Sequence, residues 1–417
     1  MVVRAPREAP FDALERRSTD ERNAALAASL SGLVAKARES SAYYGKLLAP
    51  IDPTDITDLA ALAELPVTRK ADLKTIQANH PPFGGIDTAP QRFSRIFASP
   101  GPVFEPEAAR PDYWRYARAL WATGIRAGDL VHNCFAYHFT PAGVMMETGA
   151  HAIGATVFPG GTGQTDQQAQ AAAVLRPIAY TGTPDFLRVI IEHGDEQGLD
   201  LTCFRLAHVT AGAFLPDARA FYQSRNIDVL QSYGTAELGL IAYESPAREG
   251  LIVDEGAVVE IVEPGTGTPV ADGEVGEILV TVLNPDYPLI RFATGDLSAM
   301  LREPSPCGRT NRRIKGWLGR ADQSTKIKGL FVHPHQVADI LRRHPDIGHA
   351  RLIVTREHGA DVMILKVETP EMDADLAHAV ETSMQAITRL KGRVEQAPPG
   401  SLPRDGSAIE DARDYGG

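Results

Sequence analysis

The sequence predicts an α/β protein with a parallel sheet, a second, antiparallel β region and a small α+β domain at the carboxyl end. Three observations carry this prediction. Short apolar runs alternate with helical segments between residues 152 and 234, which is typical of βαβ units. Two β-branched runs joined by Pro/Gly turn residues follow at 257–283 and indicate antiparallel strands. After Gly319 a helix, a hairpin and a second helix form a separate pattern, as expected of a small domain with its own core.

The parallel region is predicted to hold four strands, at 152–159, 178–182, 206–212 and 227–234. Three helices separate these strands. Thr165 is the expected N-cap of the first helix, and Thr183 precedes Pro184 at the start of the second, in the positions that these residue types favour. The third helix begins near residue 215. Connections this short imply right-handed crossovers and therefore a parallel sheet.

Ligands bind at the carboxyl ends of the strands in such a sheet, and Gly212 and Tyr233 fall there. Upstream, the residues at 107–124 predict a helix, with Gly124 as its C-terminal cap. Preceding it, the Pro- and Gly-rich stretch at 98–106 reads as a loop that opens onto an acidic helix start.

The carboxyl-terminal pattern comprises a helix at 335–345, a hairpin at 350–368 that turns at Gly359, and a helix at 373–392 that ends at Gly392. The charged, glycine-containing segment at 313–329 joins this pattern to the rest of the chain and suits a hinge. We therefore expect a large domain at 1–319 and a small domain at 320–417, a size that can fold by itself.

Composition excludes several classes of protein. The 417 residues carry 42 Lys and Arg against 53 Asp and Glu, a net charge of −11, which argues against general binding to nucleic acid or anionic membranes. The three cysteines are widely spaced and predict no disulfide framework, so a reducing cytoplasm is expected. No apolar run approaches the length of a membrane span, and the first residues lack the apolar core of a signal peptide.

Four motifs follow one another along the chain, and their combination is more specific than any one of them alone. They are SYGTAE (232–237), PLIRFATGDL (288–297), CGRTNRRIKGWLGRAD (307–322) and KIKGLFVHPHQV (326–337). With them the chain resembles the adenylate-forming ligase superfamily, and most closely the phenylacetate–CoA ligases, over nearly its whole length. The resemblance implies the adenylate-forming fold. It also implies the chemistry of that family, in which a carboxylic acid and ATP give an acyl-adenylate and CoA then displaces AMP.

The resemblance assigns roles to individual residues. Tyr233 would stack on adenine, and Asp296 would accept the ribose hydroxyls, an acceptor-only task for a carboxylate. Glu237 would bind Mg²⁺ through the nucleotide, and Arg320 would direct its fork of donors to ribose or phosphate as a second catalytic residue. The small domain would rotate about Asp322. The implied nucleotide-binding set is Ser99, Gly101, Gly212, Ala213, Tyr233, Gly234, Thr235, Asp296 and Arg320.

The chain departs from the family where ATP chemistry is concentrated. The family phosphate loop, Ser-Ser-Gly-Thr-Thr-Gly-Lys-Pro, matches residues 99–106, but Pro102 has replaced a hydroxyl residue, Phe104 a glycine and Glu105 the lysine. These changes remove a backbone donor, close approach and positive charge. The family's catalytic lysine position holds Ser407, and no lysine follows Lys391. The loss of that positioned charge would raise the adenylation barrier by several kcal/mol.

The family's acid pocket corresponds to NCFAYHFTPAG at 133–143. The candidates to line it are Tyr137, His138, Phe139 and Phe214. Phe214 ends the stretch Gly212-Ala213-Phe214, which matches the family's Gly-Ala-Glu stretch near adenine. These rings could pack a planar or aromatic acid, and Tyr137 is equally well explained as a core residue of a strand. Cys307 lacks the partners of a zinc site, and His333 and His335 suit a loop pair, so we expect no zinc.

Three functional hypotheses stay open. The first is an AMP-forming acyl–CoA or aryl–CoA ligase that uses ATP, Mg²⁺ and CoA, or another thiol carrier, on a small acid. The second is a non-catalytic relative that binds a nucleotide, an aromatic acid or an acyl-CoA for a partner enzyme. The third is an enzyme that retains only acyl transfer. A partner enzyme or a homodimer is compatible with each.

Overall fold

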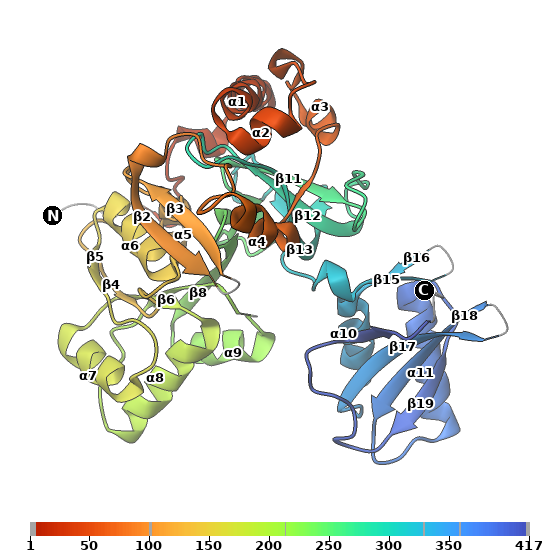
Figure 1. The fold of residues 1–417 in the computed structure, drawn as a ribbon. Helices are drawn as coiled ribbons and strands as arrows, with labels where there is room; N and C mark the ends of the chain where they lie inside the picture. The colour runs from red at the N-terminus through yellow and green to blue at the C-terminus, as the bar shows by residue number, and fades with distance from the viewer. Residues whose placement is uncertain (1–5, 100–101, 213, 328–329, 358–359, 414–417) are drawn as a thin grey trace. The chain divides into compact units, whose positions relative to one another are not determined.

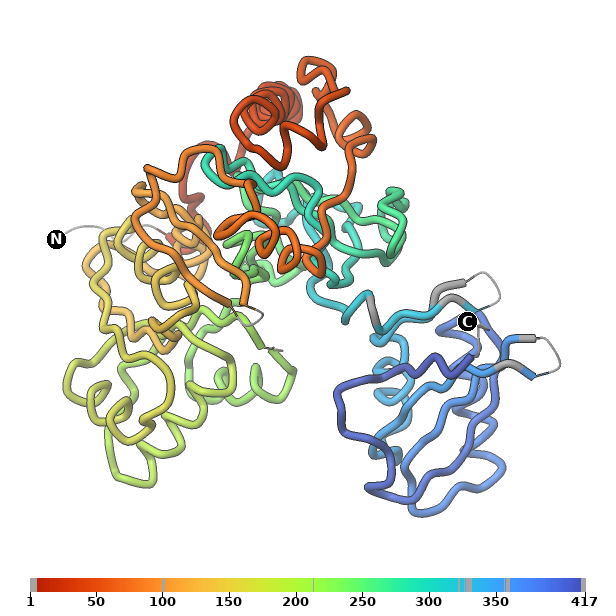
Figure 2. Tube along the Cα trace, viewed as in Figure 1, coloured from red at the N-terminus to blue at the C-terminus, as the bar shows by residue number. Residues whose placement is uncertain are grey.

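The computed structural model describes residues 6–99, 102–212, 214–327, 330–357 and 360–413 (Figures 1 and 2). The chain divides into two compact units. The large unit contains residues 1–294 and 299–316, and the small unit contains residues 295–298 and 317–417. Among the described helices, none combines the length and the apolar character that a bilayer crossing requires.

Within the described residues, twelve strands of the large sheet follow the order β11-β12-β13-β14-β10-β9-β8-β7-β6-β4-β5, with β1 paired to β13. The parallel half consists of β4 (Leu130–Asn133), β5 (Thr156–Phe158), β6 (Ala179–Gly182), β7 (Leu206–Val209) and β8 (Asp228–Thr235). The other strands are β1 (Thr68–Arg69), β9 (Gly239–Glu244), β10 (Leu251–Val253), β11 (Ala257–Val262), β12 (Val275–Val282), β13 (Leu289–Leu301) and β14 (Arg313–Ile314). The antiparallel pairing of β11 with β12 confirms the prediction at 257–283.

Helices cover both faces of the parallel half. They are α5 (Ala117–Thr123), α6 (Ala142–Ile153), α7 (Thr165–Leu175), α8 (Pro184–Glu196) and α9 (Pro216–Ser224). Successive residues of a strand point to opposite faces, and Ala179 and Tyr180 on β6 belong to different buried clusters. The cluster of Ala179 includes α5 and α6, whereas that of Tyr180 includes α7, α8 and α9. The sheet is therefore a central layer, as the α/β prediction requires.

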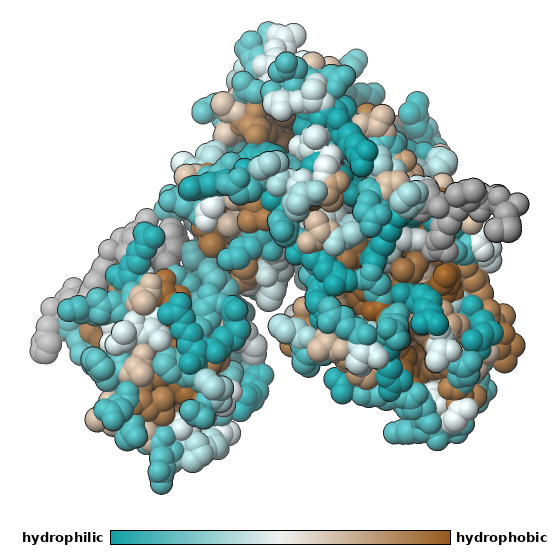
Figure 3. Space-filling view, turned by 180° about the vertical axis from the view of Figure 1, so that it is seen from behind, coloured by the Kyte–Doolittle hydropathy of each residue, from teal (hydrophilic) through white to brown (hydrophobic). Residues whose placement is uncertain are grey.

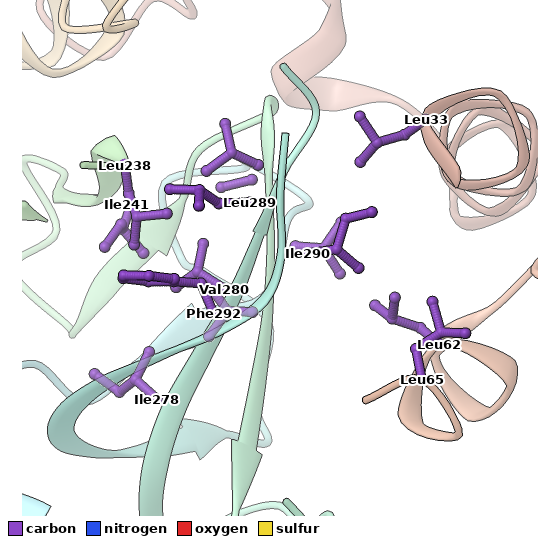
Figure 4. Close-up of a cluster of buried hydrophobic side chains, with 14 of the residues drawn as sticks. Leu33, Leu62, Leu65, Leu238, Ile241, Ile278, Val280, Leu289, Ile290 and Phe292 are labelled. Carbon is purple, nitrogen blue, oxygen red and sulfur yellow. The ribbon is translucent and has the colours of Figure 1, made fainter. Parts of the chain in front are cut away.

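The N-terminal residues form a helical cover over the antiparallel half (Figure 1). It contains η1 (Ala13–Arg16), α1 (Thr19–Ser40), α2 (Ala42–Leu47), η2 (Pro53–Asp55), α3 (Leu59–Ala63), α4 (Lys70–Asn79) and η3 (Pro90–Arg92). Ser18 starts α1 through a capping box with Glu21, which satisfies two backbone donors. Figure 4 shows Leu33, Leu62 and Leu65 on one side of the strands and Leu238 and Ile241 on the other.

A hairpin of β2 (Phe93–Ser99) and β3 (Val103–Ala108) lies beside the sheet (Figure 1, orange). The predicted helix at 107–124 is therefore wrong in its first part, and so is the acidic helix start at 98–106. Only α5, from Ala117, is helical, while Glu105 and Glu107 pair within the hairpin. Pro106 explains the error. Proline is typical of turns, but here it lies in an edge strand, where proline is tolerated. Gly124 does cap α5, at φ 109°.

Two further predictions differ from the structure at the ends of elements. Gln164, not Thr165, is the N-cap of α7, because the left-handed turn at Gln164 already bends the chain into the helix. The strand expected at 152–159 is shortened to β5, since α6 continues to Ile153. Prediction of such ends from pattern alone is uncertain by a few residues.

The small unit has a four-stranded sheet in the order β19-β18-β17-β20 and a separate hairpin of β15 and β16. Its elements are η4 (Ala321–Gln323), β15 (Thr325–Ile327), β16 (Leu330–Val332), α10 (Pro334–Arg343), β17 (His349–Glu357), β18 (Ala360–Glu368), α11 (Ala374–Thr388), β19 (Arg393–Ala397) and β20 (Ile409–Asp411). Helix α11 ends before Gly392, because Arg389 takes up the left-handed conformation. Gly359, the expected turn, lies outside the described residues.

Candidate active site

The end of β8 and its turn into β9 position four of the predicted residues of the large unit. Tyr233 is buried, and Gly234 has no room for a side chain, since a Cβ there would approach the Gly239 carbonyl oxygen and the Tyr116 hydroxyl to 2.5 Å. The Thr235 hydroxyl accepts a hydrogen bond from the Leu238 amide at 3.2 Å. This bond closes the turn that carries Glu237, so these residues form one rigid edge at the carboxyl end of the parallel strands.

Glu237 is buried and holds a lysine that the sequence analysis missed. Its side chain is 1% exposed, and Lys70 Nζ lies 2.9 Å from Oε1 and 3.2 Å from Oε2. Lys70 is the first residue of α4, immediately after β1, whose parallel pairing with β13 fixes where the helix starts. A positive charge at a helix N-terminus is unfavourable, so a lysine as the first residue of α4 is unexpected. This unfavourable placement is the sequence signal that could have identified Lys70 as a functional candidate.

Glu105 is buried inside the hairpin beside this pair. The Ser99 hydroxyl donates a hydrogen bond to its Oε1 at 2.6 Å, and the Ser99 amide donates to Oε2 at 3.2 Å. Burial raises the pKa of Glu105 to about 8, with Ser99 and Lys70 opposing the rise and Glu237 adding to it. At neutral pH the carboxyl is therefore mostly protonated, so this position does not carry the full anionic charge that the sequence suggested. Gly101, between the two strands, lies outside the described residues.

Gln77 joins helix α4 to this hairpin. Its Oε1 accepts from the Phe104 amide and its Nε2 donates to the Phe104 carbonyl, both at 2.8 Å. Nε2 also reaches the Tyr287 hydroxyl at 3.3 Å. Because Lys70 and Gln77 belong to the same helix, Lys70, Glu105 and Glu237 are held in one packed group.

Asn133 organises the segment predicted to bind the acid. Its Nδ2 donates to the Tyr137 hydroxyl at 2.7 Å and to the Gly143 carbonyl at 2.8 Å, while the Thr181 hydroxyl donates to its Oδ1 at 2.9 Å. The Tyr137 ring is thereby fixed, and it packs against the buried cluster of α5 and α6. The interpretation of Tyr137 as a core residue of a strand is wrong, because β4 ends at Asn133 and Tyr137 follows it in an irregular segment.

The two aromatic neighbours of Tyr137 are exposed, with 80% of Phe139 accessible. The Phe139 carbonyl accepts a hydrogen bond from the Ala98 amide at 2.8 Å, which ties the segment that also holds His138 to the end of β2. Phe214 lies elsewhere, against α9, with its ring 6.3 Å from that of Tyr222 and under the Arg219 guanidinium. Gly212 is exposed after β7, and Ala213 lies outside the described residues.

The remaining predicted residues belong to the small unit. Arg320 Nη1 lies 3.2 Å from Oδ1 of Asp296, and the indole of Trp317 donates to the same oxygen at 3.1 Å. Asp296 and Arg320 also pair through their backbones, and the guanidinium packs on Gly295, where a Cβ would clash. The structure therefore does bring Asp296 and Arg320 together. Trp317, which is 54% exposed, is a further neighbour that the sequence analysis did not single out.

Ser407 occupies the expected position of the lost lysine, in the loop before β20. Its hydroxyl donates to the Ile409 carbonyl at 3.0 Å and its amide to Asp405 Oδ1 at 3.0 Å. The preceding Gly406 carbonyl accepts from Gln323 of η4 at 3.3 Å. Asp322 lies in η4 by its backbone, and its side chain is not among those described.

Across the described ranges, no group of three or more His, Cys, Asp or Glu side chains could enclose a metal ion. Cys307 is half-buried near Ser305, and the His333 ring stacks on His335. Burial, followed by the neighbouring His335, lowers the pKa of His333 to about 4. A Mg²⁺ ion at Glu237 would have one protein carboxylate, so it fits the site only together with phosphate oxygens of a ligand.

A parallel sheet ending in the edge Tyr233 to Glu237, with Asp296 and Arg320 paired on a separate small unit, defines an adenylate-forming enzyme. Comparison with known proteins agrees. The family of AMP-binding enzymes matches residues 113–282, and the AMP-binding enzyme C-terminal domain matches residues 329–413. The chain belongs to this family, in the group of the phenylacetate–coenzyme A ligases.

Two relatives carry that assignment. The phenylacetate–coenzyme A ligase of Thermus thermophilus is 31% identical over 416 residues, which are 90% of this chain and 92% of the relative. That of Escherichia coli is 30% identical over 410 residues, 92% of this chain and 90% of the relative. A solved structure of 2-hydroxyisobutyryl-CoA ligase, in an open conformation with 2-HIB-AMP and CoA, shares the fold. Its TM-score is 0.82 at 23% identity over 98% of both chains, and it confirms the predicted fold class.

Proposed function

We propose that this protein is an AMP-forming ligase that joins a small carboxylic acid to CoA. The acid's carboxylate oxygen attacks the α-phosphorus of ATP, the bond to the β-phosphate oxygen breaks, and pyrophosphate leaves. The CoA sulfur, having lost its proton to solvent, then attacks the acyl carbon, and AMP leaves with the former carboxylate oxygen. The observation that carries this proposal is the salt bridge of Lys70 with Glu237 beside Tyr233 and Thr235.

Lys70 supplies the cation that the altered loop and Ser407 lack. Its side chain is 41% exposed while Glu237 is buried, so the ammonium can turn to a bound anion without leaving its partner. A positioned charge of this kind stabilises the negative charge that develops on a transferring phosphoryl group. In this proposal Lys70 takes the electrophilic role in the first half-reaction.

The other residues bind and orient. Tyr233 stacks on adenine, Gly234 and Thr235 contact the nucleotide, and Asp296 accepts the ribose hydroxyls with Arg320 beside it. Bound Mg²⁺ would offset phosphate charge and would be held by Glu237 together with the phosphates. The small domain, which we place at 320–417, turns about Asp322 between the half-reactions.

We further propose an aromatic acid as the substrate. The Tyr137 ring is fixed by Asn133, and the exposed Phe139 and His138 lie at the end of β2, next to Ser99. Phe214 is left out of this pocket because it packs on α9. The related ligases named above act on phenylacetate, which is aromatic, and on 2-hydroxyisobutyrate, which is aliphatic. The preference of this protein for an aromatic acid is therefore what the panel of acids tests.

The test is ATP–pyrophosphate exchange with Mg²⁺ and a panel of aromatic and aliphatic acids. Exchange with at least one acid is expected, lost in Glu237→Ala and reduced at least tenfold in Lys70→Ala. Lys74→Ala is the matched control, because Lys74 lies one turn further along α4 and is exposed. Equal exchange by Lys70→Ala and wild-type protein would remove Lys70 from the mechanism.

A second candidate rests on Glu105, which fills the phosphate loop's lysine position with a buried carboxyl. In that case the protein binds AMP, an aromatic acid or an acyl-CoA, either for a partner enzyme or for acyl transfer alone. The expected signature is the absence of exchange with every acid, together with calorimetric binding of AMP or acyl-CoA. The same result would refute the ligase.

A further inference from the structure

A pocket of about 380 Å³ lies in the large unit, beneath the first half of α1. Helix α1 is not seated evenly on the sheet. From Leu30 onward, Leu30, Leu33 and Val34 are buried in the core, whereas no residue between Thr19 and Ser29 is fully buried. The first half of the helix therefore stands off the strands. Figure 3 shows hydrophobic atoms reaching the surface among these N-terminal helices.

The inner walls of this pocket are apolar. Leu26 of α1, Val258 of β11, Leu59 and Leu283 are among the residues that line it. Val258 is 7% exposed, and the other three pack against the same buried cluster. The volume falls in the range of pockets that hold small organic ligands, about 300–1,000 Å³. Walls of this kind suit a hydrocarbon chain or ring.

The mouth is basic. Arg17 and Arg22 both bind the same carboxylate oxygen of Glu255, at 2.5 and 2.6 Å. Arg22 also donates to the Thr310 hydroxyl at 2.9 Å. Arg312, at the same rim, is paired with Asp272. Two arginines, Arg17 and Arg22, share the single negative charge of Glu255. One positive charge is therefore not offset by any described carboxylate at the rim.

Arg22 also has a donor to spare. Its Nε is buried and meets no hydrogen-bond acceptor among the described residues. An unmet buried donor on a charged group is unfavourable. A carboxylate that enters the pocket would relieve it once the Arg22 side chain, which is 16% exposed, turns toward the ligand. The surplus of a single charge favours a monoanion over a phosphate.

From these observations we infer that the pocket under α1 binds a monocarboxylate with an apolar body, through Arg22. The pocket is built from residues 17–29, 59, 253–259, 283 and 310–312. None of these is a residue to which the proposed ligase chemistry assigns a role, so the site is separate from the acid segment at 133–143. The inference holds whether or not the protein adenylates.

The probe is 4-benzoylbenzoate, a photoreactive aryl carboxylate, with its neutral amide as the charge control. After irradiation, peptide mapping by mass spectrometry locates the label. We expect saturable labelling of peptides that contain residues 19–29 or 253–259. Excess 4-phenylbenzoate should suppress it, and the amide should give at least tenfold less.

Two variants test the site. Arg22→Gln removes the charge, and Ser29→Phe fills the pocket while keeping both arginines; each should lose this labelling. Lys36→Gln, an exposed change on the same helix, should keep it. If a variant fails to fold, the other variant and the competition in wild-type protein decide. Label confined to other peptides such as 133–143, equal labelling by the amide, or labelling unchanged in both variants would overturn the inference.

Discussion

Lys70 Nζ lies 2.9 Å from Oε1 of Glu237, joining the first residue of α4 to the turn that follows β8. The two residues are 167 positions apart in the chain. The pair puts a half-exposed cation against a buried anion at the place where the parallel strands end.

Lys70→Met should destabilise the protein, because it leaves the buried Glu237 carboxylate without its partner. Since Lys70 is partly solvated, we expect about 1–2 kcal/mol, below the cost of breaking a fully buried pair. The double variant Lys70→Met/Glu237→Gln should recover most of this loss. Urea unfolding of the four proteins of the cycle measures it, and strictly additive single effects would contradict the coupling.

Stability should depend on pH through Glu105. Its folded pKa of about 8 lies above its ordinary value of 4.5, so between these values the folded state binds more protons than the unfolded state. The free energy of unfolding therefore falls as pH rises through this window. Glu105→Gln should flatten that fall, measured as melting temperature at pH 5, 7 and 9. Glu39→Gln, an exposed change on α1, should reproduce the wild-type slope.

Ser407→Lys should leave the ATP–pyrophosphate exchange of the wild-type protein within about twofold, because Lys70 already supplies the cation in our proposal. In the Lys70→Ala variant it should restore exchange at least tenfold, because it returns a cation to the family's lysine position. The substitution gives up one hydroxyl bond to the Ile409 carbonyl, a small loss in a partly exposed loop. Ser401→Lys adds the same charge in the same segment and should leave exchange unchanged. A tenfold gain in the wild-type background would mean that Lys70 does not supply the cation of this step.

Gln77→Ala should cost about 2–3 kcal/mol, because it leaves the amide and carbonyl of Phe104 without their side-chain partner. Urea unfolding measures the loss. Gln91→Ala, at an exposed position before the hairpin, is the control. If Gln77→Ala were as stable as this control, water would be replacing the amide and the hairpin would not depend on α4.

The sequence was informative where signals are local. Pro184 and Gly124 stand where helices begin and end, and the apolar runs of β6, β7 and β8 are short and clearly bounded, so these parts were predictable. Strand β4 was not predicted, although it lies in the parallel half between β5 and β6. Glu105 and Glu107 were misplaced because their strand is defined by pairing with β2, not by its own pattern. Lys70 was missed because its partner is remote in the chain. The roles of Tyr233, Asp296 and Arg320 stay predictions.

The bonds that Gln77 makes to Phe104 go to backbone atoms, and the pairing of Ser99 with Val103 is also backbone pairing. Neither depends on which side chain stands at 104. Phe104 is half-buried at the edge of the core, whereas Val103 belongs to the buried cluster itself. Position 104 is therefore a permissive point of the hairpin. Libraries randomised there should retain folded protein at high frequency, with proline left out because it has no amide to donate to Gln77.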